Sequence, residues 1–249
     1  MRLKGIGLTI LICLLFLPLC FSHYGYLLTL PLFSFFLIAV LGATFLRLNI
    51  FVSSEHHGDR NIPKIALTFD DGPHPQTEEI LNVLQKYQAK GSFFCIGQQI
   101  EKNPALAQRI VAEGHLIANH TYSHHKMFDV FPSQKMQADI AQCNAVIKNT
   151  TGVENVYFRP PYGVTNPPLA KAIRRAGLKS IGWSVRTYDT NKKSALELKN
   201  FLMKKVKNGD IILLHDRTPD LPQLLHEIIP YFQARGMELV TVKECLQHD

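Results

Sequence analysis

The sequence predicts an α/β domain built on a mostly parallel β-sheet. Short apolar runs typical of buried strands recur along the chain, and patterns typical of helices separate most of them. The apolar runs cover residues 64–69, 92–96, 115–118, 155–158, 180–185, 210–214 and 238–241. About seven such units are too few for a complete eight-unit barrel, so an open doubly wound sheet and an incomplete barrel both fit.

The segments between the runs carry signals typical of helices. Residues 77–89 place apolar side chains at helical spacing. Ser194-x-x-Glu197 and Thr241-x-x-Glu244 match the capping box, in which two side chains satisfy free backbone N–H groups at a helix start. Strands therefore alternate with helices, as a parallel sheet requires.

The first 50 residues differ from the rest, because residues 5–22 and 26–46 contain no charged side chain. A helix of about 20 apolar residues is long enough to cross a bilayer. We therefore expect residues 1–50 to form a membrane anchor, a transmembrane hairpin in contact with lipid. A signal peptide in the first segment and a buried core helix are the alternatives. The polar residues 51–62 are expected to form a linker, and residues 63–249 the main domain.

Positive side chains flank the two apolar segments on their outer ends only. Arg2 and Lys4 precede the first segment and Arg47 follows the second. Since positive flanks stay in the cytoplasm, the domain is expected on the cytoplasmic face of the cell membrane if both segments span. It is expected outside the cytoplasm if only one spans.

Charge and cysteine content exclude two broad classes. The net charge of +7 is spread along the chain and forms no basic stripe, so we expect no nucleic-acid partner. The five cysteines lack metal-type C-x-x-C spacing and do not indicate a disulfide framework. Cys95 and Cys143 resemble small buried hydrophobic residues.

Polar residues able to do chemistry follow the apolar runs, at the points where strands of a parallel sheet end. They are Asp70–Asp71, residues 119–125 (NHTYSHH), residues 159–163 (RPPYG), Arg186 with Asp189, and His215–Asp216. Active sites of such sheets lie at the C-terminal ends of the strands. We therefore expect these residues to meet at one rim.

His120 and His124 are four residues apart, so on a helical turn both imidazoles would point the same way. Two histidines and a carboxylate form a metal-ligand set that leaves positions open for water and substrate. A pair of surface or capping histidines is the alternative. The two carboxylates at a neighbouring strand end favour the metal site.

Asp70 and Asp71 are adjacent, and adjacent strand residues point to opposite sides of a sheet. We therefore expect one to be a metal ligand and the other a base that takes a proton from water. His215 ends an apolar run and is expected to be the general acid, since histidine titrates near neutral pH. A simple Asp-Asp-Gly-Pro turn and a satisfied core histidine are the alternatives.

Four short motifs resemble, in this order, the polysaccharide deacetylase (NodB-homology) family of carbohydrate esterases. They are TFDDGP (68–73), HTYSH (120–124), RPPYG (159–163) and LLH (213–215). The resemblance runs from about Pro63 to the end of the chain. It implies a distorted (β/α) barrel of about seven units. It also implies hydrolytic removal of an acyl group, typically acetyl, from the nitrogen of an amino sugar in a poly- or oligosaccharide.

The resemblance implies a role for each motif residue. Asp71, His120 and His124 would hold a divalent metal ion, usually Zn²⁺, that activates water. Asp70 would be the catalytic base, and His215 would protonate the departing amine.

The third motif implies further contacts. Arg159 would orient Asp70, and the backbone N–H of Tyr162 would stabilise the oxyanion. Contacts with the substrate are also expected from Pro161, Trp183 and Arg186.

The fourth family motif departs from its usual pattern, which has Asp-x-x-Asp followed by Trp. The stretch WSVRTYDT (183–190) keeps Trp183 and Asp189 but has Arg186 and Thr190. Asp189 can still tether His215. The additional cation Arg186 leads to the hypothesis of an anionic substrate, such as a lipid-linked sugar phosphate.

Three other functions fit some of the same residues. An amidase or deformylase acting on a lipid-linked sugar or another small amide would use the same motifs. A catalytically inactive, membrane-bound binding protein is less favoured, because no metal or acid/base residue is missing. A glycosidase using Asp70 and Asp71 would leave the histidines unexplained.

Overall fold

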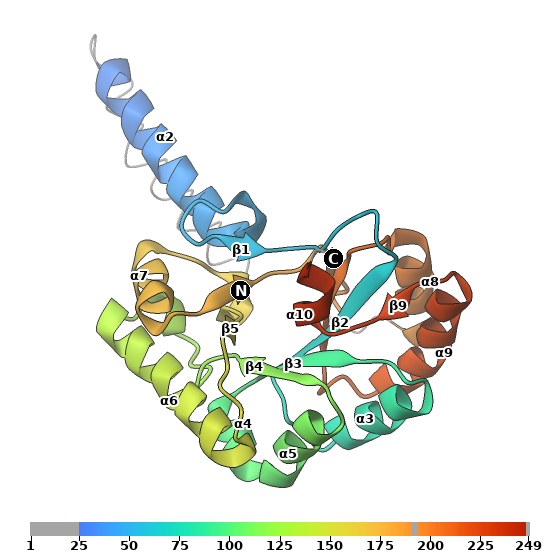
Figure 1. Ribbon diagram of the computed structural model, residues 1–249. Coiled ribbons are helices and arrows are strands. Elements are labelled where there is room, and N and C mark those ends of the chain that lie inside the picture. Colours follow the sequence, from blue (N-terminus) through green and yellow to red (C-terminus); the bar gives the residue numbers. More distant parts are fainter. Residues whose placement is uncertain (1–24, 191–193, 248–249) are drawn as a thin grey trace.

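The computed structural model describes residues 25–190 and 194–247, which form a curled parallel sheet with helices around it (Figure 1). The strand order is β1-β6-β5-β4-β3-β2-β8-β7, and β9 also pairs with β2. The strands are β1 (Ser54–Glu55), β2 (Lys64–Asp70), β3 (Gly91–Cys95), β4 (Leu116–Asn119), β5 (Tyr157–Phe158), β6 (Lys179–Ile181), β7 (Val185–Arg186), β8 (Ile211–His215) and β9 (Glu238–Leu239). The predicted α/β class and parallel sheet are confirmed.

The curl of the sheet follows from how β6 and β7 are connected. The two strands lie near opposite ends of the strand order, although only residues 182–184 separate them in the chain. Such a connection, four Cα–Cα steps long, reaches only about 13 Å, so the sheet has to curl into an open half-barrel.

The sequence predicted one strand over 180–185, and this was wrong. The carbonyl groups of Ile181 and Gly182 accept hydrogen bonds from the Arg159 side chain, at 3.1 and 2.8 Å. Those carbonyls are therefore occupied at the point where a single strand would have continued.

Side chains along β2 alternate between an outer and an inner apolar cluster. Ile65, Leu67 and Phe69 of β2 pack outward against the helices, whereas Ala66 points into the half-barrel. The inner cluster is small and contains Ala66, Phe94, Ala118, Ile181, Ile211, Val240, Val242 and Cys245. The same alternation carries the last residues of β2 and β8 inward, toward the open end.

Most helices lie around the outside of the sheet (Figure 1). They are α3 (Thr77–Lys86), α4 (Gly97–Lys102), α5 (Pro104–Ala112), α6 (Ser133–Thr151), α7 (Pro167–Ala176), α8 (Ala195–Lys205) and α9 (Leu221–Ala234). The short α10 (Val242–Leu246) covers the N-terminal end of the half-barrel, where the Val242 N–H donates to Ser92 Oγ at 2.8 Å. The C-terminal end stays open.

Both predicted capping boxes are present. Ser194 caps α8 and Thr241 caps α10. In each, the cap hydroxyl accepts from the backbone N–H of the glutamate three residues later, and the glutamate carboxylate accepts from the backbone N–H of the cap residue. These helix starts could be predicted from the sequence because the capping motif spans only four residues.

The segment predicted to be a linker, residues 51–62, packs onto the domain instead. Its residues Ser54–Glu55 form β1, the edge strand beside β6. The Gly182 N–H donates to Glu55 O at 2.7 Å, and Ser54 Oγ donates to Ser180 Oγ at 2.7 Å. A polar strand of two residues has no apolar pattern, so it could not be predicted from the sequence.

Helix α2 (Gly25–Thr44) extends away from the half-barrel (Figure 1). Its last turn is attached through Thr165, whose N–H donates to Ala43 O at 3.1 Å and whose hydroxyl donates to Gly42 O at 2.8 Å. Within residues 25–190 and 194–247, no helix is both long enough and apolar enough to cross a membrane. The first apolar segment, residues 5–22, lies outside the described residues, so the predicted hairpin has no structural support.

Candidate active site

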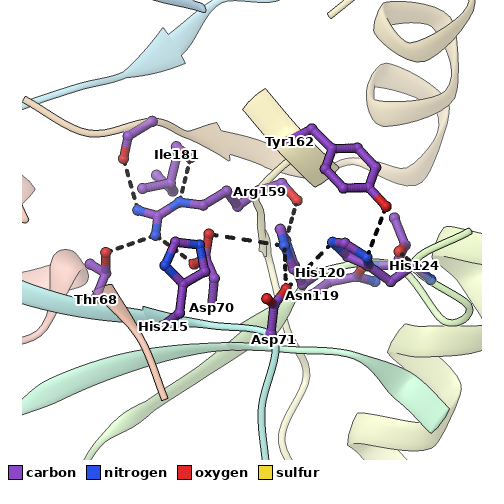
Figure 2. Close-up of polar contacts among 12 residues, drawn as sticks. Thr68, Asp70, Asp71, Asn119, His120, His124, Arg159, Tyr162, Ile181 and His215 are labelled. Atoms are coloured by element: carbon purple, nitrogen blue, oxygen red, sulfur yellow. Dashed lines mark hydrogen bonds and ion pairs between the residues drawn. The ribbon is translucent and has the colours of Figure 1, made fainter. Parts of the chain in front are cut away.

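A cleft of about 380 Å³ opens at the C-terminal end of the half-barrel. It is lined by Asp70, Asp71, His120, His124, Pro160, Tyr162, Gly163, Trp183, Arg186, Tyr188, Thr190, Leu213, His215 and Arg217. Eight of the predicted site residues therefore line one cleft, as the strand-end rule predicted, and Figure 2 shows several of them together.

Asp70 and His215 are neighbours by strand register. They are the last residues of β2 and β8, which pair in parallel with Asp70 opposite His215. Adjacent strands lie about 4.8 Å apart, and both side chains point inward. The predicted base and the predicted acid therefore stand side by side.

The sequence predicted that Asp70 and Asp71 point to opposite sides of the sheet, and this was wrong. Asp71 follows the end of β2 and has a left-handed backbone, with φ of +77°. The alternation of a strand does not continue through such a residue. Both carboxylates consequently face the same cleft.

Arg159 holds Asp70 from inside the half-barrel, although its side chain is completely buried. Its guanidinium donates to Asp70 Oδ1 and to Thr68 Oγ1, both at 2.7 Å. It also lies 3.9 Å above the ring of Phe94. A buried charge is tolerated when it is paired and its hydrogen bonds are satisfied, so Arg159 fixes one oxygen of Asp70 and leaves the other free.

The segment that carries His120 and His124 is a loop, and the predicted helical turn was wrong. Thr121 and His124 have φ of +69° and +43°, which no α-helix contains. The Asp139 carboxylate shapes the loop, because it accepts from the Tyr122 N–H at 2.7 Å and from Ser123 Oγ at 2.6 Å. Tertiary hydrogen bonds, not helical spacing, bring the two imidazoles together.

The ligand atoms of Asp71, His120 and His124 lie within 4.8 Å of one another. The shorter separations from Asp71 Oδ1 are 3.4 Å to His124 Nε2 and 3.7 Å to His120 Nε2. Ligands about 2.1 Å from a tetrahedral ion are roughly 3.4 Å apart, so the three residues fit a divalent metal.

Protonation in this group also suits a metal. His120 Nδ1 lies 2.8 Å from Arg159 O and donates to it, which turns the lone pair of Nε2 toward Asp71. Burial, and then the neighbouring His120, lower the pKa of His124 to about 4, so its imidazole is neutral at pH 7. Burial opposes ionisation of Asp71, but His120 and His124 outweigh it and hold the pKa of Asp71 below its usual value.

Asp189 tethers His215, as the resemblance implied. Asp189 Oδ1 accepts from His215 Nδ1 at 2.9 Å, and Oδ2 accepts from the His215 backbone N–H at 2.8 Å. Burial disfavours protonation of His215, but the hydrogen bond and charge of Asp189 raise its pKa above the ordinary value. Thr187 and Thr218 also donate to Asp189.

The remaining predicted substrate contacts differ in position. Tyr162 and Trp183 line the cleft, and the Tyr162 hydroxyl lies 3.4 Å from His124 Nδ1. Arg186 also lines the cleft, with its guanidinium 5.6 Å from the ring centre of Trp183. Pro161, also predicted to contact the substrate, is absent from the lining of the cleft. This residue is buried in the turn Pro161–Gly163, and its neighbour Pro160 lines the cleft instead.

Sequence reasoning missed Arg217 and Asp139, and it placed Asp216 at the rim without giving it a role. Arg217 Nε lies 3.1 Å from Asp71 Oδ2, and the strand-end rule could have found it two positions after His215. Asp216 is fully buried and accepts from Thr77 Oγ1 at 2.6 Å. Burial raises the pKa of Asp216 to about 7. No local signal marks Asp139, because its role depends on a loop 16 residues earlier.

The family model described as polysaccharide deacetylase matches residues 57–181, half of the chain. The chain belongs to the polysaccharide deacetylase family. Over 190 residues it is 35% identical to a peptidoglycan-N-acetylglucosamine deacetylase of Bacillus cereus, and the match covers 74% of this chain and 88% of the relative. It is 37% identical to a chitooligosaccharide deacetylase of Rhizobium leguminosarum bv. phaseoli, over 66% of this chain and 75% of the relative.

A solved structure of this family agrees with the fold. It is a peptidoglycan N-acetylglucosamine deacetylase with a bound benzamide ligand, at a TM-score of 0.74 and 30% identity, covering 78% of this chain and 92% of the other. Members of the family are metal-dependent hydrolases, and this chain is an enzyme of that class. Its three candidate metal ligands all come from the family motifs.

Proposed function

We propose that this enzyme removes the N-acetyl group from an amino sugar of a poly- or oligosaccharide, N-acetylglucosamine above all, with Zn²⁺ as its metal. One observation carries the proposal. A base (Asp70), an acid (His215) and a metal-ligand set face the same cleft. The names of the similar deacetylases support N-acetylglucosamine as the sugar.

In the proposed reaction, Asp70 removes a proton from the attacking water. Arg159 occupies Asp70 Oδ1, whereas Oδ2 lies 3.9 Å from His120 Nε2, beside the metal ligands. When bound to Asp71, His120 and His124, a divalent metal supplies Lewis-acid polarisation of the amide carbonyl and lowers the pKa of water. Asp70 is therefore placed to accept the proton where water is most acidic.

His215 gives a proton to the departing amine. Because Nδ1 is held by Asp189, the other ring nitrogen, Nε2, is the one available to the substrate. The raised pKa of His215 favours its protonated form, as an acid requires. We assign the oxyanion to the backbone N–H of Tyr162 and a wall of the sugar site to Trp183.

We also propose that residues 1–50 attach the catalytic domain, residues 63–249, to the membrane. The uncharged segments 5–22 and 26–46 support this. So do the exposed apolar side chains Leu30, Leu32, Phe33, Phe35, Leu37 and Ile38 of α2. By the positive-inside rule the domain lies on the cytoplasmic face if both segments span. Protease treatment of intact cells would digest the domain if only one segment spans.

The function is tested by acetate release from N-acetylglucosamine oligomers. The full chain in detergent is assayed with zinc and with a chelator, because cutting at residue 55 would remove half of β1. We expect zinc-dependent release that is lost in Asp70→Asn and kept in Asp220→Asn, a change at an exposed carboxylate. Release that resists chelation, or that survives in Asp70→Asn, would contradict the proposal.

A further inference from the structure

Two further cavities lie next to the active-site cleft. Trp183, Arg186 and Tyr188 line both this cleft and a second cavity of about 280 Å³. Arg47 and His56 line that second cavity and also a third one of about 530 Å³. Shared lining residues therefore place three cavities side by side along one path, from His215 to the segment that follows α2.

Unpaired positive charge lies along this path. Arg186 contacts the faces of Trp183 and Tyr188. The Arg47 side chain donates to the backbone carbonyls of Trp183 and Ser184. Among residues 25–190 and 194–247, no carboxylate forms an ion pair with Arg47 or Arg186. Each guanidinium therefore has N–H donors left for a ligand.

The third cavity is basic as well. Arg60, Lys205 and Lys207 line it, against the acids Glu55 and Asp210. Asp210 is already engaged by Arg60, at 2.6 Å.

The neutral state of His56 agrees with a positive field in the cavities. Burial, and next the charge of Arg47, lower the pKa of His56 to about 4. The path therefore combines a positive potential with guanidinium groups, whose paired N–H donors can bind phosphate oxygens in a bidentate manner.

An apolar surface borders the same path. Phe45 and Leu46, just after α2, line the second cavity. Nine of the exposed large hydrophobic side chains fall within residues 30–50, namely Leu30, Leu32, Phe33, Phe35, Leu37, Ile38, Phe45, Leu48 and Ile50. A ligand that is anionic and also carries a hydrocarbon chain would satisfy both surfaces.

We propose that the enzyme acts on an amino sugar joined through a phosphate ester to a lipid chain. The acetamido group lies at Asp70 and His215, the phosphate at Arg186 and Arg47, and the hydrocarbon along α2. This inference rests on the proposed deacetylase function and names its substrate class. Arg47 and Arg186 are the residues that determine specificity.

Four substrates test separately the contributions of the phosphate, the hydrocarbon chain and the sugar. They are N-acetylglucosaminyl phosphate with a dodecyl ester, the same phosphate without the chain, dodecyl N-acetylglucosaminide, and N-acetylglucosamine oligomers. With the full chain in detergent and zinc present, we expect the dodecyl phosphate to have the highest kcat/KM. Charge-assisted hydrogen bonds should favour it over the dodecyl glycoside by roughly 10- to 100-fold.

Two substitutions test the residues. Arg186→Gln and Arg47→Gln should each lower the ratio of kcat/KM for the dodecyl phosphate over the dodecyl glycoside, by about 10-fold. Arg175→Gln, at an exposed position on α7, should leave the ratio unchanged. Zinc-loaded Asp70→Asn gives a readout without turnover. Calorimetry should find tighter binding of the dodecyl phosphate than of the glycoside, and addition of Arg186→Gln should remove the difference.

The outcomes are distinguishable. Equal kcat/KM for phosphate and glycoside, or a ratio unchanged in both arginine variants, would overturn the inference while the deacetylase function stands. Preference for the oligomers over the dodecyl phosphate would overturn it in favour of a glycan polymer. No acetate from any substrate would contradict the proposed function itself, and the calorimetric comparison would then decide the phosphate site alone.

Discussion

At the residue scale, each acid/base group has one atom held by a partner and one atom free. One carboxylate oxygen of Asp70 accepts a hydrogen bond from the buried Arg159. The Nδ1–H group of His215 donates a hydrogen bond to Asp189. A reacting group held in this way loses little freedom in the transition state. For His215, burial disfavours protonation, but the hydrogen bond and charge of Asp189 raise its pKa above the ordinary value. Both partners should therefore affect the rate without touching the substrate, and Asp189 should also affect its pH dependence.

Asp189→Asn tests this for the proposed acid. Asp189 raises the pKa of His215, so His215 stays protonated until pH rises through that raised pKa. Without the carboxylate charge the pKa of His215 falls. We expect kcat/KM to drop by about 10- to 100-fold, and its alkaline limb to move to lower pH.

A pH–rate profile of acetate release provides the measurement, with Asp220→Asn as a control at an exposed carboxylate. A lower rate with an unmoved alkaline limb would mean that Asp189 only supports the local structure.

At the element scale, the loop of residues 119–125 shows which parts of the site could be predicted from the sequence and which could not. Its two histidines were predicted to converge, and they do, although the predicted helical turn is absent. Positive φ values at Thr121 and His124 depend on tertiary contacts, above all with Asp139 on α6. By contrast, β2 and β8 were predictable, because buried parallel strands are continuous apolar runs. The two-residue β1 gave no such signal.

Asp139→Asn should weaken metal binding while keeping the fold. The carboxylate accepts from two backbone N–H groups and one hydroxyl of the loop, and an amide has only one oxygen for them. Groups that orient metal ligands commonly account for about 10- to 100-fold in affinity, so we expect zinc affinity to fall by roughly 10-fold.

Competition with a chelating dye measures that affinity. Glu154→Gln, which changes an exposed acid paired with Lys148, is the matched control. An affinity equal to that of the unchanged chain would show that the loop keeps its shape without Asp139.

At the scale of the whole molecule, the candidate metal site joins parts of the half-barrel that are distant in the chain. Asp71 follows β2, whereas His120 and His124 follow β4, with β3 between these strands. The unfolded chain does not hold these three ligands together, so metal binding favours the folded state. The stability of the entire domain should therefore depend on zinc concentration.

We expect zinc to raise the Tm of the full chain in detergent. Free metal at about 1,000 times its Kd stabilises the folded state by about 4 kcal/mol. At about 2–4 °C per kcal/mol for a domain of this size, the Tm should rise by roughly 10 °C. Thermal unfolding followed by circular dichroism measures it, and a chelator should reverse the rise. His124→Ala should abolish it, whereas His125→Ala should keep it, since His125 lies outside the ligand group. An equal rise in His124→Ala would place the stabilising zinc elsewhere and remove the physical basis for water activation beside Asp70.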